Sequence, residues 1–159
     1  YAARTAAIPS PCMNPDSTPE PGPGDPGSVT APVRILCVDD SFYIAEALRL
    51  LIDDEPGLSV VGVLGSAGEL ERAVAELRPD LVLLDLSMDG QPPLEALEQA
   101  RRVRPGLRSI VYTGLDDRAT VERVLRAGVE AFVSKRHPID EVIAAVREVA
   151  AGKRPRPRC

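Results

Sequence analysis

The sequence of 159 residues has few aromatic side chains, with three tyrosines, two phenylalanines and no tryptophan. Proteins that hold single-stranded nucleic acid by stacking need a platform of aromatic rings, so this class of protein is excluded. The net charge of −5 also argues against binding nucleic acid by bulk positive charge. Hydrophobic residues make up 44% of the chain, which is enough for a folded core.

Histidine and cysteine are scarce as well, with one histidine and three cysteines. Cys12, Cys37 and Cys159 form no CxxC pair, so we expect neither a structural zinc site nor a disulfide framework. This cysteine usage is typical of a reducing cytoplasm, which is the location we expect. Cys37 lies within an apolar run and is predicted to be a small buried core residue.

No apolar run approaches the ~18–20 residues that a membrane-spanning helix needs. The chain begins with small and apolar residues, but Arg4 interrupts them and Pro9 follows. A signal peptide has a basic start and a longer apolar core. We therefore expect no contact with a membrane and no secretion signal.

Proline is abundant and unevenly placed, since 8 of the 16 prolines lie in residues 1–32 together with three glycines. Such a segment cannot form a helix or a central strand, and we predict a disordered tail there. The folded domain is then expected over residues 33–152. Residues 153–159 (KRPRPRC) are basic and rich in proline, and we expect a solvated linker or tail.

Apolar runs typical of buried strands alternate with segments of helical periodicity between residues 33 and 152. The strands are expected at residues 33–38, 58–64, 80–85, 107–113 and 130–134. A helix is expected after each strand, and Gly128 and Gly152 are expected to close the last two helices. This alternation predicts an α/β fold with a doubly wound, five-stranded parallel sheet of the flavodoxin-like type and strand order 2-1-3-4-5.

Ligands bind such sheets beyond the carboxyl ends of the strands. The predicted strand ends carry Asp39 and Asp40, Asp85, Thr113, and Lys135. Crowded carboxylates stay ionised when a cation lies among them, and Mg²⁺ prefers such oxygen ligands. A lysine and a hydroxyl can hold phosphoryl oxygens, and a carboxylate can attack phosphorus to give an aspartyl phosphate. The pattern therefore predicts phosphoryl transfer at this edge.

Other phosphate-binding motifs fit poorly. Residues 62–68 have the spacing GxxGxxG rather than the GxGxxG of dinucleotide-binding loops, and no GxxxxGK[ST] motif occurs. Haloacid dehalogenase-type phosphatases have an aspartate two residues after the nucleophile, where this sequence has Ser87. Flavodoxin needs a phosphate-cradling loop after its first strand, and Asp39 and Asp40 would repel that phosphate.

Four segments resemble the signatures of response-regulator receiver domains. They are residues 35–40 (ILCVDD), 81–88 (LVLLDLSM), 111–114 (VYTG) and 131–135 (AFVSK). The resemblance extends from residue 33 to about residue 152, and residues 124–152 are most similar to NarL/FixJ-type regulators. It implies a signalling receiver rather than an enzyme, which supports its own phosphorylation and slow autodephosphorylation.

The resemblance implies a role for each residue of the site. Asp85 would be the phosphoacceptor, and it would bind Mg²⁺ directly together with Asp40 and the backbone carbonyl of Ser87. Asp39 would act through a metal-bound water. Thr113 and Lys135 would hold the phosphoryl oxygens. Phe132 matches the aromatic switch position that moves when Thr113 is drawn to the phosphoryl group, and its alternative role is that of a plain core residue.

Two residues depart from the family pattern. The proline that usually follows the methionine of the third-strand signature is replaced by Asp89, which adds a negative charge near the phosphorylation site. The proline that often follows the lysine is replaced by Arg136, which leaves the geometry of that loop open. His137 is expected to be a solvated loop residue and a poor helix cap.

The family implies a sensor histidine kinase as phosphodonor. Phosphorylation would shift the face formed by the last two predicted helices and the strand between them, which could pair with a second copy of the chain. Two alternatives stay open. The chain could belong to a transcription regulator that contacts DNA through a C-terminal helix-turn-helix domain absent from this sequence, or it could be an interaction module that works without phosphorylation.

Overall fold

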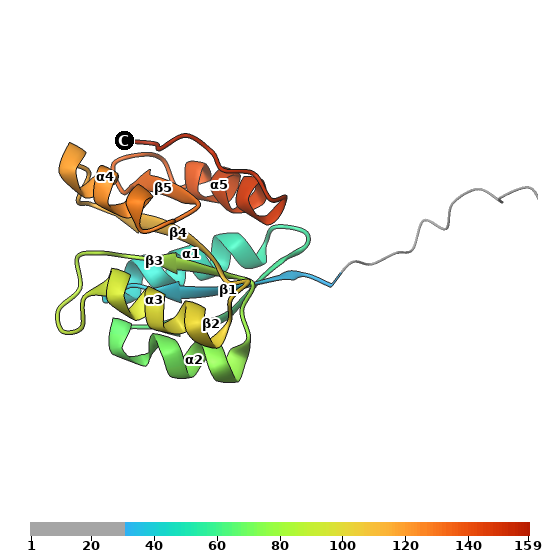
Figure 1. The fold of residues 1–159 in the computed structure, drawn as a ribbon. Coiled ribbons are helices and arrows are strands. Elements are labelled where there is room, and N and C mark those ends of the chain that lie inside the picture. The colour runs from blue at the N-terminus through green and yellow to red at the C-terminus, as the bar shows by residue number, and fades with distance from the viewer. Residues whose placement is uncertain (1–30) are drawn as a thin grey trace, which may run out of the picture.

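The computed structural model describes residues 31–159, so the predicted tail of residues 1–32 lies outside the described residues except for its last two. Strands and helices alternate along the described chain, and one helix is preceded by a short 3₁₀ turn (Figure 1). The elements are β1 (Val33–Val38), α1 (Phe42–Asp53), β2 (Leu58–Leu64), η1 (Ala67–Glu69), α2 (Leu70–Leu77), β3 (Leu81–Leu84), α3 (Pro93–Val103), β4 (Arg108–Thr113), α4 (Arg118–Arg126), β5 (Ala131–Ser134) and α5 (Asp140–Ala150).

The five strands form one parallel sheet in the order β2-β1-β3-β4-β5, which confirms the predicted fold class. Helices cover both faces of this sheet (Figure 1). One apolar cluster joins the sheet to α1 and α5, and a second joins it to α2, α3 and α4. The central strands β1 and β3 are apolar along most of their length because both of their faces are covered.

Cys37 is fully buried in β1, as predicted for a core residue. Burial raises the pKa of its thiol to about 12, and the nearby charges of Asp39 and Asp53 act in the same direction. The thiolate is the reactive form of cysteine. Cys37 is therefore an inert part of the core.

The ends of the helices follow local backbone rules. Gly128 and Gly152 have φ angles of +72° and +80°, in the left-handed region that favours glycine, and they end α4 and α5 as predicted. Helix α2 ends at Leu77, and Arg78 follows it with a φ angle of +48°, because Pro79 disfavours right-handed helical backbone at the residue before it. Its start differs from the expected single helix, since Ser66 caps a 3₁₀ turn with a 3.2 Å bond from the amide of Gly68.

The C-terminal segment differs from the solvated linker that its composition predicts. Arg158 forms an isolated parallel bridge with Val133 of β5, and its guanidinium pairs with Glu141 and Glu148 of α5. The pattern of charge and proline contains no signal for this contact, because it depends on how the segment folds back onto α5 and β5. Among residues 31–159, none of the helices combines the length and the apolar character that a membrane span requires.

Candidate functional site

The predicted site residues meet at the carboxyl edge of the sheet. Asp39, Asp85 and Lys135 each stand one residue beyond the end of a strand. Their backbone amides still continue the parallel ladder, donating to Leu64 O at 2.9 Å, to Val38 O at 2.9 Å and to Thr113 O at 2.8 Å. The sheet therefore fixes the direction of these three side chains as firmly as that of strand residues.

The ammonium group of Lys135 bridges the two buried carboxylates. Nζ of Lys135 lies 2.7 Å from Oδ2 of Asp39 and 2.7 Å from Oδ2 of Asp85. Asp39 and Asp85 are 4% and 3% exposed, whereas Asp40 is exposed at the mouth of the site. Buried carboxylates so close together repel each other, and the ammonium group offsets this repulsion.

The two carboxylates are also held by tight turns. The amide of Ser41 donates to Oδ1 of Asp39 at 2.9 Å, and the amide of Ser87 donates to Oδ1 of Asp85 at 3.1 Å. Each carboxylate thus has one oxygen on a backbone amide and the other on Lys135. This arrangement fixes the orientation of both groups before any ligand binds.

A hydroxyl completes the site on the β4 side. Thr113 is fully buried, and its Oγ1 lies 3.3 Å from Oγ of Ser87, where either hydroxyl can donate. The amide of Leu115 donates to the same Oγ1 at 3.3 Å. The structure therefore brings together Thr113, Ser87, Lys135 and the carboxylates, all of which were predicted from the strand ends and the family resemblance.

The three carboxylates fit a divalent cation. Asp39, Asp40 and Asp85 each offer an oxygen, and these atoms lie within 4.8 Å of one another. Lys135 compensates one of the three negative charges, so two charges remain to be balanced. Oxygen ligands and partial exposure through Asp40 suit Mg²⁺, which keeps several waters when bound.

Phe132 lies beside the site in β5 and is fully buried in the cluster between the sheet and α4. It pairs with Val111 across the ladder, two residues before the pairing of Thr113 with Ser134. Both of the roles weighed from the sequence are compatible with this position.

Sequence reasoning missed Tyr112, whose aromatic ring lies close to the ammonium group of Lys135. Nζ of Lys135 lies 5.7 Å from the centre of the Tyr112 ring, within range for a cation–π contact. Tyr112 is buried against the α1 and α5 face, because alternation along β4 turns it away from Thr113. Its position next to Thr113 in a strand was the signal that could have identified it.

The two departures from the family pattern do not take part in the contacts between Lys135 and the carboxylates. Asp89 is exposed and does not belong to the group of converging carboxylates. Arg136 points to Asp116, with Nη2 at 3.3 Å from Oδ1, and Asp116 also accepts a 2.8 Å bond from the Ser134 hydroxyl. Asp116, which the motifs did not indicate, thus ties the loop after β4 to the end of β5.

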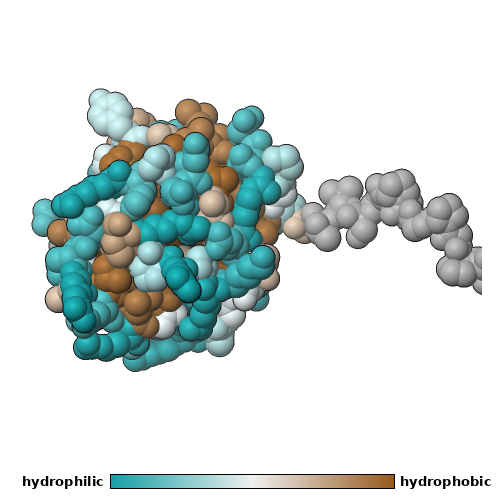
Figure 2. Space-filling model, turned by 90° about the horizontal axis from the view of Figure 1, so that it is seen from above, coloured by the Kyte–Doolittle hydropathy of each residue, from teal (hydrophilic) through white to brown (hydrophobic). Residues whose placement is uncertain are grey.

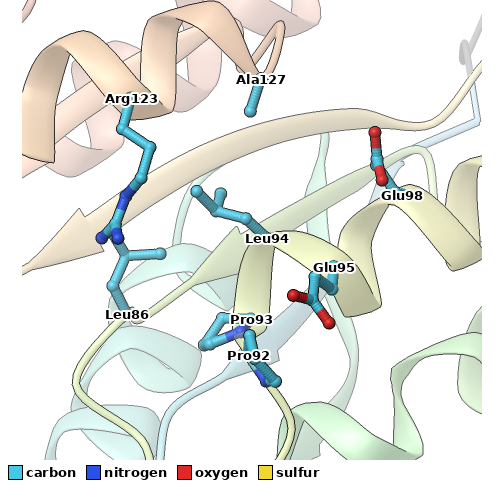
Figure 3. Close-up of a pocket in the computed structure, with 8 residues that line it drawn as sticks. All are labelled: Leu86, Pro92, Pro93, Leu94, Glu95, Glu98, Arg123 and Ala127. Atoms are coloured by element: carbon cyan, nitrogen blue, oxygen red, sulfur yellow. The ribbon is translucent and has the colours of Figure 1, made fainter.

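A separate groove of about 450 Å³ runs between the start of α3 and α4 (Figure 3). Its walls are Leu86, Pro92, Pro93, Leu94, Glu95, Glu98, Arg123 and Ala127. Arg123 reaches down from α4 toward Leu86, the residue that follows Asp85 (Figure 3). The converging carboxylates and Lys135 do not line this groove, so the chemistry predicted from the strand ends lies outside it.

Two titratable side chains in the site, Lys135 and Tyr112, are expected to make the protein less stable at alkaline pH. Burial alone lowers the pKa of Lys135, but hydrogen bonds and charges from Asp39 and Asp85 outweigh it, so its pKa is raised. Burial raises the pKa of Tyr112, against the opposing charge of Lys135. A raised pKa in the folded state stabilises the protein below the unfolded pKa and this stabilisation is lost as pH rises.

We therefore expect the free energy of unfolding to fall as pH rises above about 10, where unfolded tyrosine and lysine lose their protons. Urea unfolding between pH 9 and 11.5 measures this slope. The Tyr112→Phe variant removes one of the two groups and should show a shallower slope. A free energy of unfolding that stays level or increases over this range would contradict the prediction.

Comparison with known proteins identifies the family. Residues 35–147 match the response regulator receiver domain family. The response regulator GacA of Pseudomonas aeruginosa is 30% identical over 122 residues, which are 77% of this chain and 57% of GacA. The chain thus spans a little over half the length of this curated relative.

Solved structures agree with this assignment. A LuxR-family two-component response regulator from Aurantimonas sp. SI85-9A1 is 31% identical, with a TM-score of 0.73 over 78% of this chain and 89% of that one. The receiver domain of the putative response regulator NarL from Mycobacterium tuberculosis shares the fold, at 23% identity and a TM-score of 0.72 over 78% of this chain and all of that one. The acidic edge with its lysine, the sheet order and these matches show that the chain belongs to the response regulator receiver domain family, a signalling module of two-component systems.

Proposed function

We propose that this receiver accepts a phosphoryl group on Asp85, in a Mg²⁺-dependent transfer from a sensor histidine kinase in the cytoplasm. The observation that supports this most directly is the position of Lys135, whose Nζ lies 2.7 Å from both Asp39 and Asp85. A lysine held there can contact an oxygen of a phosphoryl group attached to Asp85. Its positive charge then stabilises the negative charge of the transfer.

In the transfer, a carboxylate oxygen of Asp85 attacks phosphorus and forms the new P–O bond. The bond from phosphorus to the histidine nitrogen of the donor breaks, and that nitrogen retains the electron pair and takes up a proton. The amide of Ser87 and Nζ of Lys135 orient the attacking carboxylate beforehand. Asp40, Asp85, the carbonyl of Ser87 and, through a water, Asp39 would hold Mg²⁺, which supplies positive charge to the phosphoryl oxygens when bound.

The response passes to the face formed by α4, β5 and α5. The hydroxyl of Thr113 exchanges its contact with Ser87 for a phosphoryl oxygen, which moves the start of the loop after β4. Phe132 lies under α4 and adjusts its packing to the space that this movement opens. Phosphorylation then shifts the population between two arrangements of this face, and the partner reads the difference; a second copy of the chain is one such partner.

Acetyl phosphate tests the transfer without a kinase. With Mg²⁺ present we expect an adduct of about 80 Da in the intact mass, the mass of one phosphoryl group. Chelation of the metal should abolish it, because the charge around Asp85 is then unbalanced. Asp85→Asn removes the nucleophile and should prevent the adduct, whereas Asp89→Asn, the same change at an exposed carboxylate, should keep it.

An unchanged mass, or an adduct that survives Asp85→Asn, would exclude this function. The alternative is then an interaction module that works without phosphorylation. Such a module would bind its partner equally well with and without beryllofluoride, which mimics the phosphoryl group. The contacts of Lys135 with Asp39 and Asp85, which Asp89 and Arg136 leave intact, favour the phosphorylated receiver over this alternative.

The greater length of GacA supports a second proposal, that the receiver controls a DNA-binding transcription regulator. In that case DNA is contacted by a C-terminal helix-turn-helix domain, and the acidic receiver itself makes no contact with DNA. The reading frame downstream of codon 159 tests this proposal. A frame that continues into a helix-turn-helix pattern supports it, and an immediate stop codon excludes it.

A further inference from the structure

The sheet ends at β5, and the outer edge of this strand is occupied by the C-terminal segment of the chain. The amide of Arg158 donates to Phe132 O at 2.9 Å, and the amide of Ser134 donates to Arg158 O at 2.8 Å. These two bonds enclose Val133, as a further parallel strand would. The unpaired amide and carbonyl groups of an edge strand are a template for such an addition.

The side chain of Arg158 anchors the segment to α5. Its Nε lies 2.7 Å from Oε2 of Glu141 and its Nη2 lies 2.8 Å from Oε1 of Glu148. The side chain of Arg158 is only 19% exposed, whereas Arg154 and Arg156 are exposed. Among the arginines of the basic tail, Arg158 therefore binds the two glutamates because of its position in the segment, and not because of its charge alone.

The sequence around Arg158 suits an extended segment on a strand edge. Pro155 and Pro157 prevent a helix and favour extended backbone. Proline has no amide hydrogen to donate, so it is tolerated where the backbone faces away from the neighbouring strand. Arg158 stands between Pro157 and Cys159, and its amide hydrogen is donated to Phe132 O of β5.

We propose that the edge of β5, together with Glu141 and Glu148, is a docking surface for an extended segment that carries arginine, and that residues 156–159 of this chain are its occupant. The docked segment acts as a strap across the side of the molecule formed by α4, β5 and α5 (Figure 1). Figure 2 views the molecule from this side, where hydrophilic and apolar side chains are interspersed. Nη1 of Arg158 is buried and finds no hydrogen-bond partner among residues 31–159, which weakens the docking and suits a displaceable strap.

Docking of the strap does not require phosphorylation of Asp85, but it changes what a partner can contact on the α4–β5–α5 face. A partner that adds a strand to β5, or that uses Glu141 and Glu148, competes with the strap for the same groups. Opposite charge makes the acidic pair specific for a basic segment. The strap thus keeps this edge closed until a partner with better contacts displaces it.

Hydrogen exchange at two neighbouring amides of the full chain tests the strap. The amide of Ser134 bonds to Arg158 O, whereas the amide of Lys135 bonds to Thr113 O within the sheet. In Arg158→Glu, repulsion by Glu141 and Glu148 should release the segment. We expect the Ser134 amide to exchange about tenfold faster or more, with no change at Lys135.

Arg156→Glu is the matched control, since it makes the same change of charge in the same segment at an exposed position. It should leave the exchange of Ser134 as in the unchanged chain. Restoring opposite charges, with Glu141→Arg and Glu148→Arg added to Arg158→Glu, should slow the exchange of Ser134 again. The proposal is overturned if Arg158→Glu leaves Ser134 protected, if Arg156→Glu accelerates it equally, or if the reversed charges fail to restore protection.

Discussion

Replacing Lys135 by methionine is expected to lower the free energy of unfolding of the metal-free protein by about 3 kcal/mol, the cost of breaking a buried ion pair by removing one partner. Asp39 and Asp85 are 4% and 3% exposed and lose the cation that lies 2.7 Å from each of them. Their repulsion is then unopposed in a region that water hardly reaches. Breaking such a pair costs about 3–5 kcal/mol. We expect a loss at the low end of this range because Lys135 itself keeps some contact with solvent.

Urea unfolding in the presence of a chelator measures this loss. Lys153→Met is a matched control, because the chain has two lysines and Lys153 is exposed. Adding Mg²⁺ should recover part of the lost stability, since the metal can balance the same carboxylates. The prediction is wrong if Lys135→Met costs no more than Lys153→Met, in which case the carboxylates do not need the ammonium group.

The second large effect is expected in the core beneath α4. Phe132→Ala should lower the free energy of unfolding by about 3–5 kcal/mol, because it removes a fully buried ring and leaves a cavity. The ring packs in the cluster between the sheet and the helices α2, α3 and α4. The β5 backbone at this residue is also tied on both sides, to β4 and to Arg158, so the site has little freedom to collapse.

Phe42→Ala provides the control for this change, because the only other phenylalanine is 69% exposed at the start of α1. A surface substitution of this kind stays within about 0.5 kcal/mol. Both variants can be compared by urea unfolding at neutral pH. Equal effects of the two substitutions would show that the Phe132 ring is not part of a tightly packed core.

The fold could be predicted because the α/β pattern is strong and local. Each strand is a short apolar run, and glycine or proline stands near most of the helix ends. Some apolar residues of the helical spacing nevertheless face solvent, since Leu51, Val103 and Leu125 are 39%, 44% and 43% exposed. Periodicity locates a helix, but the width of its buried face depends on what packs against it.

The acidic edge could be predicted because parallel strands carry their carboxyl ends to one side of the sheet. Asp39, Asp85 and Lys135 are adjacent for this reason, although up to 96 residues separate them. Tyr112 and Asp116 were not predicted. The contact of Tyr112 depends on the face of the sheet to which its side chain points, and that of Asp116 depends on the path of the loop after β4. No sequence motif specifies either property.

Composition and order alone determined the alternation of elements, the sheet and the residues at its edge, because these depend on backbone rules and apolar runs that act over short distances. Tertiary structure decided that Tyr112 lies beside Lys135, that Asp116 binds the end of β5, and which arginine of the tail docks. Burial and charge pairing join residues that are far apart in the sequence. The sequence has few aromatic residues, and for this protein the places that the fold gives them matter more than the classes of protein that their small number excludes.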